Sequence, residues 1–142
     1  DSRNRLLRAL AETRAGHASL VVATPRGMPP HAWSGTPQKQ VHLRRRFMLL
    51  GQTLDGMRVW DIRQALAVVR QLIGSQPRFE LAASRSMAVN TLYASLFEED
   101  IQRLELRSVP ESHRDGPDYL GVLKVLDFPD ALGAARARGQ IR

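Results

Sequence analysis

Stretches with the character of β-strands alternate with helical stretches along this sequence. The longest helical pattern places apolar residues at spacings of three and four, which is typical of one face of an amphipathic helix. The residues of that face are Val59, Ile62, Leu66, Val69 and Ile73. The expected elements are a helix at 2–15, a strand at 20–23, a helical stretch at 42–73 interrupted around 51–56, a strand at 78–83, a helix at 87–97, a strand at 103–107, and two helical pieces at 119–126 and 129–138. Because helices join the successive strands, we predict an α/β fold with three αβα layers around a mostly parallel sheet.

The chain is expected to form one domain over residues 1–142, since this length rarely holds two. A long loop is expected at 25–41, where closely spaced prolines and glycines leave no room for a helix. These are Pro25, Gly27, Pro29, Pro30, Gly35 and Pro37. A loop of this length inside a compact domain is usually either functional or disordered.

The composition excludes several kinds of chemistry. The sequence has no cysteine, which rules out disulfides, thiolate zinc sites and cysteine nucleophiles. Its four histidines show no metal-ligand spacing, and no glycine-rich phosphate or dinucleotide motif occurs, so we expect neither a metal nor a cofactor. Apolar runs are too short for a membrane helix, and no signal-peptide pattern is present. We therefore expect a soluble chain that does not contact a membrane, and its compartment stays open.

The positive charge is concentrated in one part of the chain. The net charge is +7, and residues 1–46 hold nine Lys and Arg against two acidic residues, whereas residues 47–142 hold twelve of each. A basic segment of this kind can bind an anion or a nucleic acid. Nucleic-acid binding is the minor alternative, because no recognised motif is present and aromatic residues make up only 6% of the chain. A solvated arginine-rich surface explains the same charges.

The most informative stretch is the predicted strand, turn and helix at 79–97, because ligands and catalytic groups gather at the carboxyl ends of parallel strands. A nucleophile elbow places a serine between small residues in a tight strand-to-helix turn. Ser86 fits this place with Ser84 and Ala88 as its small neighbours, and a second frame centres the turn on Ser84. Neither frame contains glycine. The simpler interpretation is an ordinary turn in which the serines cap the helix.

Further polar candidates lie outside this turn. His113 follows a predicted strand end, where it can bind a ligand or transfer a proton, or order its loop through hydrogen bonds. Arg58 and Asp61 are three residues apart on one predicted helix, and we expect them to form a structural ion pair. Trp33 and Trp60 are expected to be packing residues rather than ligand platforms.

Several stretches resemble a known family. Arg45–Arg63 resembles the helix before the nucleophile elbow in α/β-hydrolases of the acetyl xylan esterase and dienelactone hydrolase kind, with planctomycete-type bacterial members most similar. Asn90–Phe97 resembles the helix after their elbow. Pro110–Pro117 and Val122–Pro129 resemble their next loop and helices, and Thr24–Gly27 resembles the strand end before the loop. The resemblance extends from about residue 19 to the end of the chain.

This resemblance implies the central and C-terminal part of an α/β-hydrolase fold and, as the parent activity, hydrolysis of esters such as acetyl groups on a polysaccharide. In an active enzyme Ser86 or Ser84 would attack the carbonyl, the backbone N–H of Met87 would hold the oxyanion, and His113 would be the only local base.

The sequence also departs from the family pattern. The elbow glycines are replaced, and the remaining triad partners and earlier strands of the family fold fall outside this stretch. We therefore favour a catalytically degenerate domain, acting as a structural or binding module of a larger protein. An active acetyl esterase is the alternative. The partners expected are an ester or carbohydrate substrate, the remainder of a larger polypeptide, or a second copy of the chain.

Overall fold

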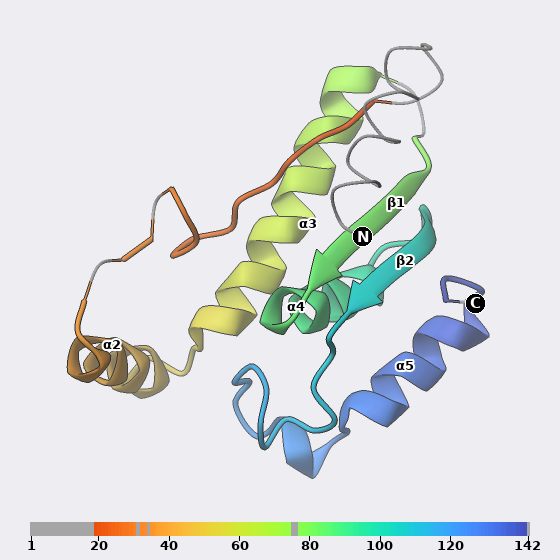
Figure 1. Cartoon of the computed structure of the whole chain (residues 1–142). Coiled ribbons are helices and arrows are strands. Elements are labelled where there is room, and N and C mark those ends of the chain that lie inside the picture. Colours follow the sequence, from red (N-terminus) through yellow and green to blue (C-terminus); the bar gives the residue numbers. More distant parts are fainter. Residues whose placement is uncertain (1–18, 31, 34, 75–76, 142) are drawn as a thin grey trace.

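The computed structural model describes residues 19–30, 32–33, 35–74 and 77–141 (Figure 1). Its elements are the helices α2 (Pro37–Leu49), α3 (Leu54–Ile73), α4 (Ser86–Ser95) and α5 (Phe128–Ala137), the strands β1 (Phe79–Ser84) and β2 (Ile101–Arg107), and a short 3-10 turn η1 (Val122–Lys124). The predicted strands at 78–83 and 103–107 and the helices that precede and follow the first of them are confirmed. The helix expected at 2–15 lies outside the described residues.

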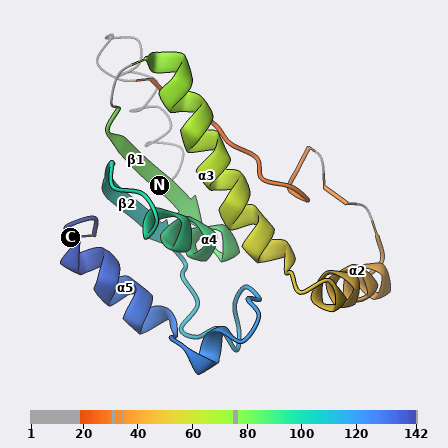
Figure 2. The same cartoon turned by 180° about the vertical axis from the view of Figure 1, so that it is seen from behind.

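The two strands form a parallel pair joined through α4. The register runs from Phe79 opposite Ile101 to Ser84 opposite Arg107, with an irregularity between Phe79 and Glu80. Helices α3 and α4 lie on one face of this sheet, and α5 packs against α4 (Figures 1 and 2). The core between them is apolar and includes Ile62, Leu66, Leu92, Ile101, Leu104, Ala131 and Ala135. A mixed α/β structure with a parallel sheet is therefore confirmed.

The opposite face of the sheet carries polar and small side chains. In β1, residues alternate between half-buried and exposed, and the exposed ones are Glu80, Ala82 and Ser84. In β2, Gln102 and Arg103 are also exposed. Among the described residues, helices cover only the apolar face, so these residues form two layers.

The strand expected at 20–23 is not formed. Residues 19–25 are extended but have no strand partner among the described residues, and Val21 and Val22 are 58% and 76% exposed. A β-branched apolar run favours an extended backbone, but a strand also requires a neighbour to pair with. The prediction was wrong because the neighbour it assumed is missing from this part of the structure.

The long loop is shorter than the predicted 25–41. Helix α2 begins at Pro37, so the prediction was wrong over the last five positions of that range. Pro37 occupies the first turn, where a missing N–H costs nothing, and the Thr36 hydroxyl accepts a hydrogen bond from the Lys39 N–H at 3.4 Å. A proline counted as a helix breaker is in fact the start of the helix.

The expected break near 51–56 separates α2 from α3. Gly51 adopts a left-handed conformation with φ 70°, which ends α2, and Thr53 caps α3 by accepting a hydrogen bond from the Gly56 N–H at 3.0 Å. None of the described helices combines the length and the apolar character needed to cross a membrane.

Candidate functional site

The turn between β1 and α4 holds an arginine in its strained position. Arg85 has φ 56° and ψ −135°, a conformation that residues with a side chain rarely adopt. Two backbone bonds hold it there: the Arg85 N–H donates to the Arg107 carbonyl at 2.9 Å, and the Ala88 N–H donates to the Arg85 carbonyl at 2.9 Å. In a nucleophile elbow the strained residue is the nucleophile itself. Here that residue is Arg85.

The two candidate serines flank the strained residue. Ser84 is the last residue of β1 and Ser86 the first of α4, and both are exposed. Neither hydroxyl forms a hydrogen bond within the described residues, so neither is paired with His113. The cap position of α4 is Arg85, without a side-chain cap, so the expected serine cap is not formed either. Met87, the expected oxyanion donor, lies in the first turn of α4.

His113 is buried, and both of its ring nitrogens have partners. Nδ1 lies 3.0 Å from the Pro117 carbonyl oxygen, and Nε2 lies 2.7 Å from the Tyr93 hydroxyl. Because a carbonyl only accepts, Nδ1 carries the proton, and in the neutral ring Nε2 accepts from Tyr93. The backbone N–H of His113 donates to Asp127, and its ring packs against Phe128 with the centroids 4.1 Å apart. These contacts order the loop that follows β2.

The Tyr93 hydroxyl is a donor rather than a base. Burial, with smaller effects of Asp127 and Asp130, raises the pKa of Tyr93 to about 12. The phenol therefore stays protonated near neutral pH and can donate its proton in the hydrogen bond to His113 Nε2.

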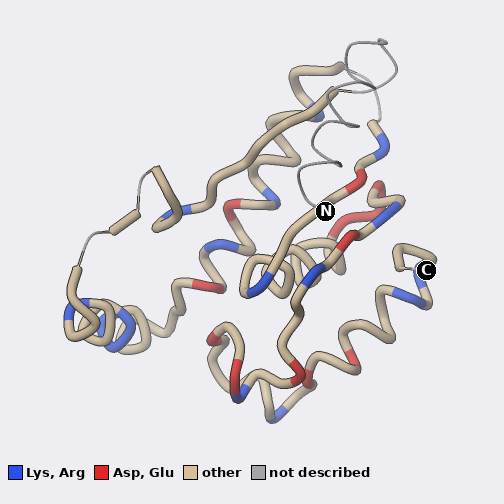
Figure 3. Tube along the Cα trace, viewed as in Figure 1, with Lys and Arg blue, Asp and Glu red and all other residues tan. Residues whose placement is uncertain are grey.

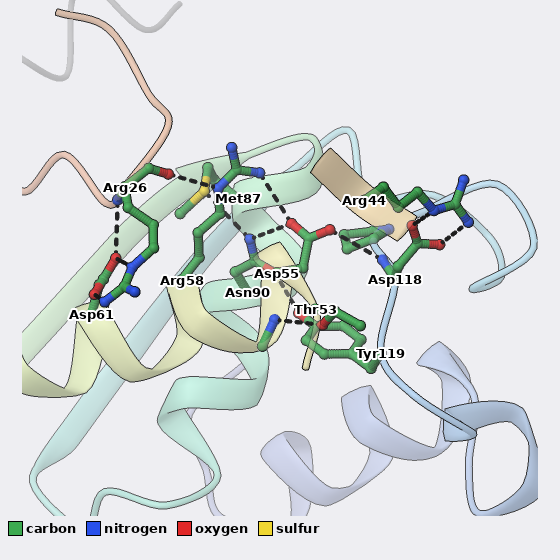
Figure 4. Close-up of polar contacts among 12 residues, drawn as sticks. Arg26, Arg44, Thr53, Asp55, Arg58, Asp61, Met87, Asn90, Asp118 and Tyr119 are labelled. Carbon is green, nitrogen blue, oxygen red and sulfur yellow. Dashed lines mark hydrogen bonds and ion pairs between the residues drawn. The ribbon is translucent and has the colours of Figure 1, made fainter. Parts of the chain in front are cut away.

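A buried polar network joins α3, α4 and the loop after β2 (Figure 4). Asn90 on α4 is fully buried, and its amide donates to Asp55 at 3.1 Å while its carbonyl oxygen accepts from the Tyr119 hydroxyl. The second oxygen of Asp55 accepts from the Asp118 N–H at 3.1 Å. Arg58 pairs with Asp55 at 3.1 Å. Every group in this network has a partner, so it holds three segments together and leaves no free base.

Tyr119 is a donor for the same reason as Tyr93. Burial is the main cause that raises the pKa of Tyr119 far above that of an ordinary tyrosine, and the nearby negative charge of Asp55 adds to it. Its hydroxyl therefore stays protonated near neutral pH and donates to Asn90.

The predicted Arg58–Asp61 pair is not formed. Arg58 binds Asp55 and the Arg26 carbonyl, while Asp61 binds Arg26 through that residue's backbone N–H at 2.9 Å and its guanidinium at 2.5 and 2.8 Å. Side chains on a helix lean toward its N-terminus, so Arg58 reaches back to Asp55 rather than forward to Asp61. The prediction was right that both residues form ion pairs and wrong about their partners. The observed pairs fix the segment around Arg26 to α3 (Figure 4).

An open pocket of about 580 Å³ lies beside this network. It is lined by Arg26, Gly51, Gln52, Thr53, Gly56, Met57, Trp60, Tyr119 and Leu120. The Trp60 ring is 54% exposed with the Arg26 guanidinium 5.8 Å from its centroid, so Trp60 is not the packing residue we expected. Trp33 does pack, since it stacks on Phe47 with the centroids 5.7 Å apart.

No group of three His, Asp or Glu side chains placed to hold a metal ion occurs in the part of the chain that the structure describes. Comparison with protein-family models, with curated proteins and with solved structures finds no match for this chain. The resemblance to α/β-hydrolases therefore remains a prediction from the sequence motifs.

Sequence reasoning missed the central residues of the network. An asparagine in the middle of an otherwise apolar helix, as Asn90 is within Met87–Ala94, is the one signal that could have indicated a buried polar contact. Arg26 and Asp61 are 35 positions apart, and nothing in the sequence relates them. Asp55 and Tyr119 likewise meet only through the fold.

Acid is expected to weaken the attachment of the Arg26 segment. Hydrogen bonds from Arg26, opposed by burial, hold the pKa of Asp61 below that of an ordinary aspartate. A carboxyl group with a lowered pKa stabilises the fold above its unfolded value of about 3.9, and this contribution is lost as the pH falls through the folded value. Urea unfolding should show Asp61→Asn less stable than the unaltered chain by about 1 kcal/mol at pH 7. The free energies of unfolding of the two proteins should converge as the pH falls through the lowered pKa of Asp61. A difference that stays constant down to acidic pH would contradict this account.

Proposed function

We propose that this chain is a catalytically silent α/β module with a structural or binding role, related to part of an α/β-hydrolase. The observation that carries the proposal is Arg85 in the strained position of the turn after β1. A guanidinium does not attack an ester, because it stays protonated and offers no lone pair. The backbone angles at position 85 resemble those of an elbow, whereas the side chain at that position is a surface cation.

The groups around the turn support the same conclusion. A serine nucleophile needs a base within hydrogen-bond reach, and Ser84 and Ser86 have none among the described residues. For His113 to act as that base, it would have to give up both Tyr93 and Pro117 and leave its buried site. An active esterase using Ser84 or Ser86 therefore requires the loop that carries His113 to rearrange. A catalytically silent module requires no such rearrangement.

The open edge of β1 supports a binding role. The N–H groups of Phe79 and Arg85 donate to carbonyls at the two ends of β2, so the odd-numbered residues of β1 face that strand. The backbone groups of Glu80, Ala82 and Ser84 therefore point the other way, where no described strand pairs with them. An unpaired edge of this kind accepts another strand by backbone hydrogen bonding.

The extended segment at 19–25 fits the same interpretation. It runs in the same direction as β1 in both views, and the bonds of Arg26 to Asp61 fix its end to α3 (Figures 1 and 2). Its side chains Val21 and Val22 are exposed. A further strand, parallel to β1 and supplied by the remainder of a larger polypeptide, would pair with β1 and cover these residues. Such a strand would extend the two-stranded sheet toward a full α/β-hydrolase sheet.

Proline scanning of β1 tests the open edge. Without its partner strand, the chain is expected to self-associate through β1 in a concentration-dependent way, which light scattering after size exclusion detects. Ala82→Pro removes an N–H that points to the open edge and should abolish the association while the chain stays folded. Ala83→Pro is the matched control, because it removes an N–H directed to β2 and should unfold the sheet. A chain that remains monomeric at all concentrations, or association that survives Ala82→Pro, would contradict the proposal.

A further inference from the structure

Helix α2 carries a concentration of positive charge that the rest of the fold does not use. No acidic residue occurs between Ser19 and Leu54, and α2 alone contains Lys39, Arg44, Arg45 and Arg46. Figure 3 shows these blue positions gathered on a helix that stands to one side of the sheet. The structure leaves no residue of α2 fully buried, so its basic character does not follow from core packing.

Three of these cations have no partner among the described residues. Arg44 pairs with Asp118, whereas Lys39, Arg45 and Arg46 form no ion pair or hydrogen bond through their side chains there. In the remainder of the described chain many arginines are neutralised by carboxylates, as in the pairs Arg26–Asp61, Arg58–Asp55, Arg63–Glu98 and Arg70–Asp100. The positive charge of α2 is therefore available to a partner.

All three unpaired cations of α2 are exposed. Leu43, Phe47 and Met48 are the half-buried residues of α2 and mark its inner side. At about 100° per residue, Lys39 and Arg46 lie within about 20° of each other at the edge of the inner side, and Arg45 lies about 100° from Arg46, on the side opposite Leu43. Lys39 and Arg46 are about 10 Å apart along the axis. The outer side is a short basic face.

The helix dipole affects the cations of α2 differently, because Arg46 lies in the last turn, where a cation is favoured. Lys39 is in the first turn, where the helix dipole favours an acidic residue, and α2 has none there. No acidic side chain is available at three or four positions from Arg45 or Arg46 to offset their charge. A bound polyanion would offset the unfavourable position of Lys39 and the repulsion between the neighbouring arginines.

We propose that the outer face of α2, formed by Lys39, Arg45 and Arg46, binds the phosphate backbone of a nucleic acid, independently of the role proposed for the β1 edge. Guanidinium groups match phosphate oxygens in geometry as well as charge. The aromatic ring of α2, Phe47, is turned inward and stacked on Trp33, so contacts are to phosphates and do not depend on base sequence. Val41, Leu49 and Leu50 of α2 and its cap are exposed as well, so the test includes a membrane arm.

Binding of the full chain to a fluorescein-labelled 20-base-pair duplex tests this proposal. We expect fluorescence anisotropy to show affinity that falls with salt, with a slope of log K against log salt near −3 if three phosphates are contacted. The variant Lys39→Gln, Arg45→Gln, Arg46→Gln should lower affinity at least tenfold at low salt and flatten this slope. These side chains are exposed, so circular dichroism should show an unchanged fold.

The matched control removes the same charge elsewhere. Arg114→Gln, Lys124→Gln, Arg136→Gln also alters three exposed cations, and it should lower affinity less than threefold. Equal losses in the two variants would show that only net charge matters, and absence of binding at low salt would also overturn the proposal. A third arm uses vesicles containing phosphatidylserine. Tighter binding to these vesicles than to the duplex, lost in the α2 variant, would identify α2 as a membrane contact and refute the nucleic-acid assignment.

Discussion

Asn90→Ala is expected to lower the free energy of unfolding by about 3 kcal/mol, because it removes two hydrogen bonds, leaves the Tyr119 hydroxyl without its acceptor and opens a cavity at a fully buried position. The amide of Asn90 donates to Asp55, and its carbonyl oxygen accepts from the Tyr119 hydroxyl. Position 90 is fully buried, so no water takes the place of the lost acceptor there, whereas Asp55 keeps its bonds to Arg58 and Asp118. Urea unfolding followed by circular dichroism measures the change.

A double-mutant cycle distinguishes the network from simple loss of volume. Tyr119→Phe removes only the hydroxyl and should cost about 1 kcal/mol in the unaltered chain. In the Asn90→Ala background the same change should cost little or nothing, because the hydroxyl has already lost its acceptor. Additive costs would show that Asn90 and Tyr119 do not act through their hydrogen bond.

Gly116→Ala is expected to destabilise the chain by about 2 kcal/mol through overpacking. A Cβ at position 116 would lie 2.7 Å from the Phe128 ring and 2.9 Å from Pro110. The Phe128 side chain is almost completely buried and packs against His113, so it cannot move aside cheaply. The midpoint of thermal or urea unfolding should fall accordingly.

Gly133→Ala provides the matched control in helix α5. A Cβ at this position meets nothing within 4 Å, and alanine is a better helix former than glycine. This variant should therefore raise stability by about 0.5–1 kcal/mol. If Gly116→Ala left stability unchanged, or raised it as Gly133→Ala is expected to do, the tight packing of the loop against Phe128 would be disproved.

The spacing of apolar residues within short stretches of sequence correctly predicted helix α3 and strand β2. The spacing of Ile62 and Leu66 and the stop at Gly74 identified α3, which ends at Ile73 as expected. The alternation around Leu104 and Leu106 identified β2. These elements bury their apolar side against each other, so periodicity and burial agree.

The incorrect predictions concern residues whose conformation or pairing depends on a partner elsewhere in the chain. The run Leu20–Ala23 has the composition of a strand but no strand partner among the described residues. Arg58 has a carboxylate three residues away on either side along the helix, and the direction of its side chain explains why it pairs with Asp55. In the turn after β1, the sequence showed two serines around an arginine, and only the backbone angles showed which residue is strained. Residue type alone could not show which position of the turn is strained.

Hydrolysis of p-nitrophenyl acetate by the full chain tests the claim of catalytic silence most directly. The comparison is between the unaltered chain, Ser84→Ala and Ser86→Ala, whose side chains are exposed and dispensable for packing. We expect the same slow, non-saturating rate for all three, since this ester also reacts with ordinary surface nucleophiles. Saturable turnover in the unaltered chain that disappears in Ser84→Ala or Ser86→Ala would contradict the account and show that a serine beside Arg85 is a nucleophile.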